Sequence, residues 1–342
     1  MIRMGVLCPS EIAARRFMPA LMLCKDCFSF AGVAVAAKEE WGGREPPSGS
    51  LLEQEAEKAR RFGETYGGRM YASYSSLIAD RDIDAVYVPL PPALHFPWGR
   101  KVLESGKHLF MEKPFTTCRG DTESLISLAA AKHLAVHENY MFVYHSQLSY
   151  IKQLLAGNSL GTVRLARIDF GFPFRGAQDF RYNKDLGGGA LTDCGGYTLR
   201  LATELLGGTA TLTSASLVQA SEYSVDIAGA AIMENAEGVA AQLAFGMDNT
   251  YRCSLDIWGS KMSLYTNRIL TAPAGYVPEV ILKSKDGEKT VRLNADDTFL
   301  KSLQDFYQKI SAPSAADYSA IIKQAILIDE FKAMSKSRFI LR

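Results

Sequence analysis

Apolar and polar positions along the first 140 residues follow two periods in turn. Short apolar runs predict buried strands at Met4–Leu7, Phe30–Ala36, Ala85–Val88, His108–Met111 and Leu134–His137. Apolar residues at helical spacing predict helices between them, at Ile12–Leu23, Glu53–Phe62, Tyr74–Ala79, His95–Ser105 and Thr122–His133. Strands that alternate with helices predict an α/β fold with a Rossmann-type, doubly wound, mostly parallel sheet. The glycines, prolines and polar residues of 41–56 predict an insertion.

From about residue 160 the pattern changes to alternation with a period of two. It predicts strands at 162–170, Thr211–Val218, Val225–Met233, Gly238–Phe245, Arg252–Ile257, Met262–Tyr265, Glu279–Leu282 and Thr290–Leu293. Few helices lie between them, so we expect a large, mostly antiparallel sheet. Amphipathic helices at Thr298–Ile310 and Tyr318–Ser335 are expected to close the chain. The sequence thus predicts a nucleotide-type domain at residues 1–140 and an α+β domain at residues 141–342.

Composition narrows the classes of function. The formal net charge is +1, with 47% hydrophobic and 22% charged residues, so electrostatics gives no reason to expect nucleic acid or an anionic membrane. No apolar run approaches the ~18 residues of a membrane span, and no leader-like segment precedes the first strand, so we expect a cytoplasmic protein. Six scattered cysteines predict no disulfide framework, and Cys24-Lys-Asp-Cys27 lacks a second ligand pair, so no metal site is expected.

The loop after the first strand stands where Rossmann folds carry the fingerprint G-x-G-x-x-G/A. From Cys8 to Ala13 this chain has C-P-S-E-I-A, so only the last residue matches. Ser10 is small enough for close approach of a phosphate to the backbone. Cys8 occupies the tight-turn position, and Glu11 would lie near an anionic ligand unless it points away. Dinucleotide binding at Cys8, Ser10, Glu11 and Ile12 is therefore a hypothesis with an atypical loop.

The second strand ends at Ala36-Ala37-Lys38. In dinucleotide folds an acid at this point often binds the adenosine ribose. Its absence, with a lysine in its place, favours the 2′-phosphate of NADP. A solvated loop lysine is an equally good interpretation, and Glu39 and Glu40 follow directly.

Lys113 follows the predicted strand His108–Met111, between Glu112 and Pro114. Pro114 disfavours helix at Lys113, so the lysine is expected at the carboxyl end of the strand, where ligands bind. A lysine there can polarise an oxygen or lower the pKa of a neighbouring phenol. The alternative is a salt-bridged surface lysine.

Three consecutive glycines, Gly187–Gly189, lead into a helix that Gly207 and Gly208 end. Its first turns carry Asp193 and Tyr197, which are four residues apart and therefore share one face. A carboxylate and a phenol on one face behind a flexible segment suit proton transfer. A glycine-rich turn, with Asp193 as a cap and Tyr197 in the core, is the other interpretation.

Together these motifs resemble the Gfo/Idh/MocA family of nicotinamide-dependent oxidoreductases, named for glucose–fructose oxidoreductase and inositol dehydrogenase, nearly end to end. The segments that carry the resemblance are Gly5–Leu21, Pro89-Leu-Pro…His95, Gly106–Pro114, Asp179-Phe-Arg181 and Gly187–Tyr197. The family's frequent histidine after the aspartate is Tyr197 here. A tyrosine at this position resembles the branch of the family that contains dihydrodiol dehydrogenases and nucleotide-sugar 3-ketoreductases. Within that branch, residues 10–21, 137–142 and 180–182 are more similar to the sugar reductases.

The resemblance implies hydride transfer between a nicotinamide and the carbonyl or alcohol carbon of a sugar, in particular a nucleotide-linked keto-sugar. Tyr197 is implied as the proton donor. Lys113 would favour its phenolate, and Asp193 would orient Lys113 or accept a sugar hydroxyl. Further residues implied at the cofactor or substrate are Leu90, His95, Glu112 and Arg181. The expected cofactor is NADP, with NAD as the alternative, and the expected assembly is a homodimer or higher homo-oligomer.

Two other functions stay open. The atypical loop at Cys8 would suit a non-catalytic sensor of dinucleotides or sugars, although a sensor has no need of Lys113, Asp193 and Tyr197. A structural protein that assembles through an exposed sheet face would leave Glu112-Lys113-Pro114 unexplained.

Overall fold

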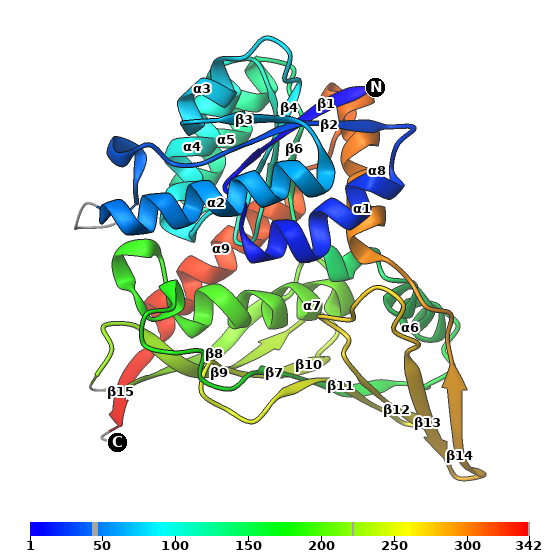
Figure 1. The fold of residues 1–342 in the computed structure, drawn as a ribbon. Helices are drawn as coiled ribbons and strands as arrows, with labels where there is room; N and C mark the ends of the chain where they lie inside the picture. Colours follow the sequence, from blue (N-terminus) through cyan, green and yellow to red (C-terminus); the bar gives the residue numbers. More distant parts are fainter. Residues whose placement is uncertain (43–46, 221, 341–342) are drawn as a thin grey trace. The chain divides into compact units, whose positions relative to one another are not determined.

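The computed structural model describes residues 1–42, 47–220 and 222–340, and the chain forms two compact units (Figure 1). The first unit comprises Met1–Asn139 and Phe299–Ile322, and the second comprises Tyr140–Thr298 and Lys323–Arg342. The chain passes from the first unit to the second after Asn139. The segment Phe299–Ile322 then belongs to the first unit again. The sequence pattern, which predicts that one domain follows the other along the chain, did not indicate this return. The predicted insertion at 41–56 lies partly outside the described residues.

Among the described residues, six strands form the sheet of the first unit, in the order β3-β2-β1-β4-β5-β6. Their bounds are β1 (Ile2–Leu7), β2 (Phe28–Ala34), β3 (Arg69–Tyr71), β4 (Ala85–Val88), β5 (His108–Met111) and β6 (Val136–Glu138). All neighbours run parallel, which confirms the Rossmann-type sheet. The strand order reverses between β1 and β4, the point at which ligands of such sheets bind.

The helices of the first unit bury apolar side chains against this sheet. Their bounds are α1 (Met18–Leu23), α2 (Gly49–Tyr66), α3 (Tyr74–Ala79), α4 (His95–Glu104) and α5 (Arg119–Ala131). In the core, Trp98 and Val102 of α4 belong to one cluster with Leu109 and Met111 of β5. Gly99 permits this packing, because a Cβ there would lie 2.6 Å from the methyl carbon of Met111. The helices expected at the end of the chain are α8 (Thr298–Ser311) and α9 (Ser319–Met334).

A second sheet contains nine strands among the described residues, in the order β14-β13-β12-β11-β7-β10-β9-β8-β15. The bounds are β7 (Val163–Gly171), β8 (Thr211–Ala220), β9 (Asp226–Glu234), β10 (Ala240–Gly246), β11 (Arg252–Gly259), β12 (Met262–Asn267), β13 (Glu279–Ser284), β14 (Gly287–Arg292) and β15 (Lys336–Ile340). Only the β7–β10 and β8–β15 pairs within this described sheet are parallel. The predicted large, mostly antiparallel sheet is confirmed.

The two faces of this sheet differ. Helix α7 (Gly196–Leu206) lies along one face (Figure 1), towards which the central strands direct Phe170 and Phe245. The opposite face exposes large apolar side chains: Trp258 is 61% exposed, and Tyr265 and Ile232 are 38% and 37% exposed. We call this second surface the open face.

Two strands and one α-helix of the described residues were not predicted. Strand β3 has only three residues, and their side chains are largely exposed, so no apolar alternation marks it. Strand β15 follows a helix that was expected to end the chain. Helix α6 (Ser146–Ala156) begins at an unusual cap, because the His145 side chain accepts a hydrogen bond from the Gln147 N–H and histidine is not a common N-cap residue.

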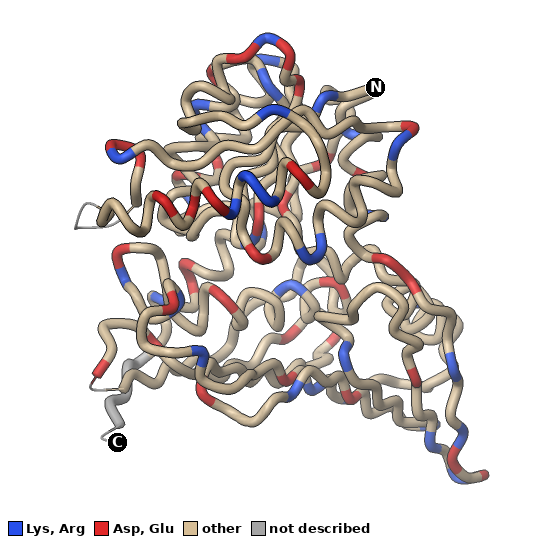
Figure 2. Tube along the Cα trace, in the orientation of Figure 1, with Lys and Arg blue, Asp and Glu red and all other residues tan. Residues whose placement is uncertain are grey.

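Basic and acidic residues are interspersed along the chain and do not separate by sign (Figure 2). Within the described residues, no helix is both long and apolar enough to span a membrane.

Candidate active site

The loop after β1 takes the conformation that glycine usually supplies. Cys8 has φ 76°, in the left-handed region, and its N–H donates to the Ala34 carbonyl of β2. Ser10 then caps the following helix, because its hydroxyl accepts from the Ala13 N–H at 3.3 Å. The Ala14 N–H donates to the Ser10 carbonyl, so the N–H groups of Glu11 and Ile12 precede the first helical hydrogen bond. The backbone thus forms the turn of the fingerprint without its first glycine.

The Cys8 thiol adds no charge to this loop. Burial, with a smaller contribution from Glu55, raises the pKa of Cys8 to about 12. The thiol is therefore neutral at physiological pH and does not repel an anionic ligand.

Substitution of Cys8 tests the left-handed turn. We expect Cys8→Val to be less stable than Cys8→Gly by about 1–2 kcal/mol, because an L-residue destabilises the fold by that amount in this region, glycine does not, and a β-branched residue fits it worst. Cys8→Gly should be tolerated, since glycine adopts positive φ freely. Urea unfolding of both variants measures the difference. Equal stability of the two would contradict the assigned conformation.

Lys38 and the two glutamates that follow it differ in their exposure and contacts. Lys38 and Glu39 are exposed, whereas Glu40 accepts hydrogen bonds from the N–H groups of Tyr74 (2.7 Å), Ser75 (2.9 Å) and Ala37 (3.1 Å). Burial opposes ionisation of Glu40, but these bonds and the Ser75 hydroxyl lower its pKa. Glu40 is thus a carboxylate committed to the first turn of α3.

His95 connects the loops after β4 and β5. The ring is fully buried; its Nδ1 lies 2.7 Å from the Pro114 carbonyl oxygen and its Nε2 2.8 Å from that of Leu90. Burial lowers the pKa of His95 to about 4, although both carbonyl contacts act in the opposite direction. Any effect of His95 on a ligand therefore acts through the position of these loops.

Glu112 is anchored behind Lys113 by a buried network. Its Oε1 accepts from the Tyr87 hydroxyl (2.8 Å) and from the Asn139 amide (2.7 Å). Burial raises the pKa of Glu112, and these two bonds oppose the rise. Asn139 in turn accepts from Ser302 of α8 at 2.8 Å. Lys113 is half-buried at the carboxyl end of β5, as its sequence position predicts.

Asp193 lies in η7 (Leu191–Gly195), the turn that continues into α7. Its Oδ2 accepts from the Arg181 Nε at 2.7 Å, and both carboxylate oxygens of Asp179 lie 3.1 Å from the Arg181 Nη1. Burial would lower the pKa of Arg181, but Asp193 and Asp179 outweigh it and raise that pKa. Asp193 is thus a nearly buried carboxylate held by a guanidinium. The sequence indicated Arg181 and Asp193 separately but not their ion pair.

Tyr197 lies in an aromatic environment. The ring is 7% exposed, and its centroid lies 5.2 Å from those of Phe170 and Tyr140 and 6.0 Å from that of Phe142. The hydroxyl lies 3.9 Å from the Met141 sulfur, a weak acceptor. Aromatic packing fixes the ring, as the core interpretation predicted.

The glycine run has a packing role that the sequence did not reveal. A Cβ at Gly188 would lie 2.4 Å from the Arg181 carbonyl oxygen, and one at Gly189 would lie 2.6 Å from Asp226 Oδ1. Asp226 also accepts from the Leu191 N–H at 2.6 Å. The glycines thus bring the start of η7 against the segment that carries Arg181.

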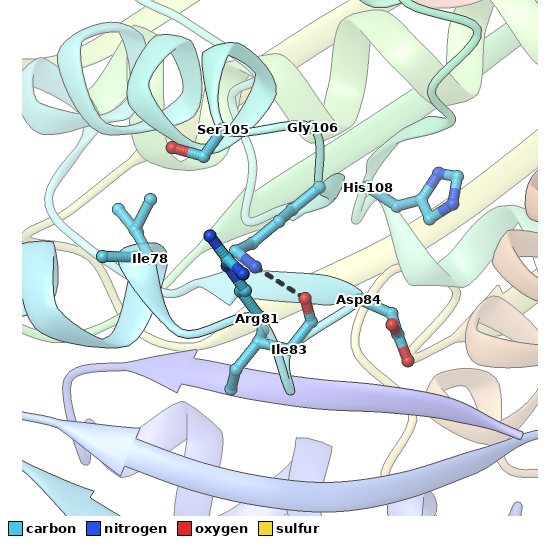
Figure 3. A pocket seen from close by; sticks show the side chains of 9 residues that line it. Ile78, Arg81, Ile83, Asp84, Ser105, Gly106 and His108 are labelled. Carbon is cyan, nitrogen blue, oxygen red and sulfur yellow. Dashed lines mark hydrogen bonds between the residues drawn. The ribbon is translucent and has the colours of Figure 1, made fainter.

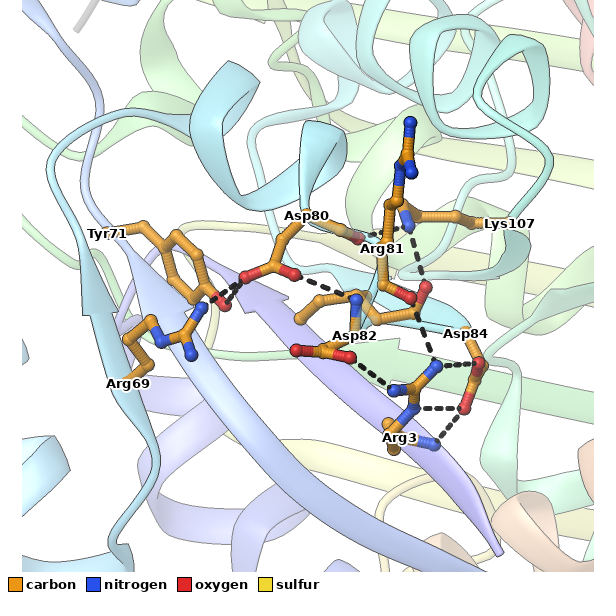
Figure 4. Close-up of polar contacts among 9 residues, drawn as sticks. Arg3, Arg69, Tyr71, Asp80, Arg81, Asp82, Asp84 and Lys107 are labelled. Atoms are coloured by element: carbon orange, nitrogen blue, oxygen red, sulfur yellow. Dashed lines mark hydrogen bonds and ion pairs between the residues drawn. The ribbon is translucent and has the colours of Figure 1, made fainter.

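A recess of about 480 Å³ lies elsewhere, at the amino ends of β4 and β5 (Figure 3). There the Lys107 amine donates to the carbonyl oxygens of Asp80 (2.7 Å) and Ile83 (2.6 Å). Arg3 pairs with Asp82 and Asp84 (Figure 4). These contacts tie β1 to the turn before β4, so the cluster is structural and lies at the edge opposite Lys113.

Comparison with known proteins identifies the family. Residues 44–140 match the model of the Gfo/Idh/MocA oxidoreductase family with an NAD-binding Rossmann fold, and residues 148–265 match the Gfo/Idh/MocA C-terminal domain.

The similar proteins include two reductases. The dTDP-3,4-didehydro-2,6-dideoxy-alpha-D-glucose 3-reductase of Streptomyces violaceoruber is 36% identical, over 96% of this chain and 94% of that protein. A 3-ketoreductase of Actinomadura kijaniata, solved with NADP and TDP-benzene, is 33% identical with a TM-score of 0.90, over 99% of each chain. The chain therefore belongs to the Gfo/Idh/MocA family of oxidoreductases, with an NAD-binding Rossmann domain and that family's C-terminal domain.

Proposed function

We propose that this protein is an NADP-dependent reductase of a dTDP-linked 3-keto-deoxysugar. The observation that carries the proposal is the likeness to 3-reductases of such sugars over 96% of the chain. Consumption of NADPH in the presence of a dTDP-linked 3-keto-sugar tests it. The sensor alternative rested on the atypical loop after β1, and the left-handed Cys8 weakens that argument.

The residues of the first unit fit a dinucleotide. The left-handed turn at Cys8, its neutral thiol and the N–H groups of Glu11 and Ile12 suit a pyrophosphate at a helix start. We assign Cys8, Ser10, Glu11 and Ile12 to that role and Lys38 to the 2′-phosphate. Leu90 and Glu112, placed by His95 and Asn139, would shape the nicotinamide end. Arg181 is assigned to the cofactor or the substrate on the family resemblance.

In the proposed reaction, NADPH supplies the hydride that reduces the ketone carbon. The developing alkoxide takes a proton from the Tyr197 hydroxyl, which becomes a phenolate. A free phenol has a pKa near 10, so a nearby cation is needed to stabilise that phenolate. We assign this role to Lys113, whose side chain also suits the substrate oxygen. We assign Asp193, which Arg181 holds at 2.7 Å, to accept a hydrogen bond from a sugar hydroxyl.

Lys38 should select NADPH over NADH. We expect Lys38→Ala to weaken NADPH binding by about tenfold or more, because a charge-assisted hydrogen bond contributes roughly 1.5–3 kcal/mol. NADH binding should not change, since NADH has no 2′-phosphate. Calorimetric titration measures both, and Lys25→Ala, which removes another exposed lysine of the same unit, is the control. An equal loss for both cofactors would contradict the assignment.

We also propose that the open face pairs two copies of the chain in the cytoplasm. Trp258 and Tyr265 expose aromatic surface on the open face, as contact surfaces between proteins do, and a recess of about 220 Å³ lies beside Trp258, Arg167 and Asp256. All six cysteines are free thiols, which suits a reducing compartment. Light scattering should give at least twice the monomer mass; a monomer at high concentration would contradict the pairing.

A further inference from the structure

An exposed aromatic surface lies on the second unit, outside the groups that the proposed reaction uses. Phe174, in the segment after β7, is 42% exposed. Its ring packs on Tyr182 with centroids 4.9 Å apart, and Tyr182 packs on Tyr223 at 4.9 Å. The Tyr182 hydroxyl donates to the Met247 carbonyl at 2.7 Å, which fixes the middle ring. We call Phe174, Tyr182 and Tyr223 the aromatic plate.

A cation stands beside the plate. The Arg175 side chain is exposed, and its guanidinium lies 4.9 Å from the centre of the Phe172 ring. Among the described residues, no carboxylate is paired with Arg175. Arg181, in contrast, is committed to Asp179 and Asp193. Arg175 is therefore the guanidinium at this place that is available to an anion.

Aromatic contacts connect this surface with Tyr197. The Tyr197 ring lies 5.2 Å from Phe170, and Phe170 lies 6.1 Å from Phe172, on which Arg175 rests. If a sugar bound at Tyr197 carries a nucleoside diphosphate, its phosphates and base extend away from Tyr197. They then need binding partners on the protein surface beyond the sugar. An arginine followed by an exposed ring supplies both, because guanidinium binds phosphate and bases stack on aromatic side chains.

We propose that Arg175 and the aromatic plate bind the nucleoside diphosphate of the substrate, with the phosphates at Arg175 and the pyrimidine base stacked on Phe174. This inference rests on the proposed function and deepens it. The fixed Tyr182 ring packs against Phe174 at a tilt of 53°, and the exposed part of the Phe174 ring would take the base.

Calorimetric titration of the full chain with thymidine diphosphate and with thymidine tests the proposal. Phe174→Ala should weaken binding of both by about 5–100-fold, since stacking contributes roughly 1–3 kcal/mol per base. Phe174→Tyr, which keeps a ring, should restore it. Arg175→Gln should weaken binding of the diphosphate by about tenfold or more and leave thymidine unchanged. Arg164→Gln, which removes an exposed arginine of the same unit, is the control.

The outcomes separate this inference from the proposed function. Wild-type affinity for thymidine diphosphate in folded Phe174→Ala and Arg175→Gln would overturn the inference alone. A loss of NADPH binding in both variants would also overturn it, since the surface would then serve the cofactor. No binding of thymidine diphosphate to the wild type would overturn the inference and the assigned substrate together.

Discussion

Replacement of Tyr197 by phenylalanine should lower kcat for ketone reduction by about 10²–10⁴-fold, the usual contribution of a general acid. The change removes one oxygen and keeps the ring among Phe170, Tyr140 and Phe142. Steady-state kinetics at saturating NADPH gives kcat, and calorimetry should show unchanged NADPH affinity.

A matched control uses Tyr265→Phe, which removes a phenol from the open face and should leave kcat unchanged. If Tyr197→Phe retained wild-type kcat while Lys113→Met lost it, the proton donor would have to be another group. Equal losses in the two tyrosine variants would point to general destabilisation.

Asp193→Asn should lower the free energy of unfolding by about 3 kcal/mol, because removal of one partner from a buried ion pair leaves the other charge without compensation. Arg181 keeps Asp179 as a partner, at 3.1 Å, so the loss should be at the lower end of the range for such pairs. Activity should fall as well, since Asp193 is proposed to meet a sugar hydroxyl. Urea unfolding measures the first effect, and kcat/KM the second.

The double variant Arg181→Met, Asp193→Leu separates these two roles. Apolar replacement of a whole buried pair is often neutral or stabilising, so stability should recover relative to Asp193→Asn. Turnover should stay low, because neither polar group is restored. Recovery of turnover together with stability would show that the ion pair serves the fold alone.

Local pattern predicted most of the fold. Most strands of both sheets show a clear pattern of apolar residues in the sequence. Cys8, Lys38 and Lys113 were predicted to follow the carboxyl ends of such strands. Strand β3 was missed because its exposed side chains carry no such period. The return of Phe299–Ile322 to the first unit depends on packing between segments far apart in the sequence, which local pattern does not encode.

The sequence indicated individual residues of the candidate site, but it did not indicate which of them contact one another. Cys8 looked like a defect because L-residues rarely adopt positive φ, and only the backbone shows that it takes the turn of a glycine. The engagement of Glu40 by α3, 34 residues along the chain, and the pairing of Arg181 with Asp193 depend on tertiary structure. The proposed roles of Tyr197 and Lys113 come from the family resemblance and are predictions for kinetics.

The most direct test of the proposed function is a stoichiometric assay with NADPH and dTDP-3,4-didehydro-2,6-dideoxyglucose. We predict that NADPH absorbance falls by one equivalent per keto-sugar consumed, that the product is the 3-hydroxy sugar, and that NADH is a poorer donor. Failure to consume NADPH, by enzyme that binds both NADPH and thymidine diphosphate, would contradict the assigned reaction.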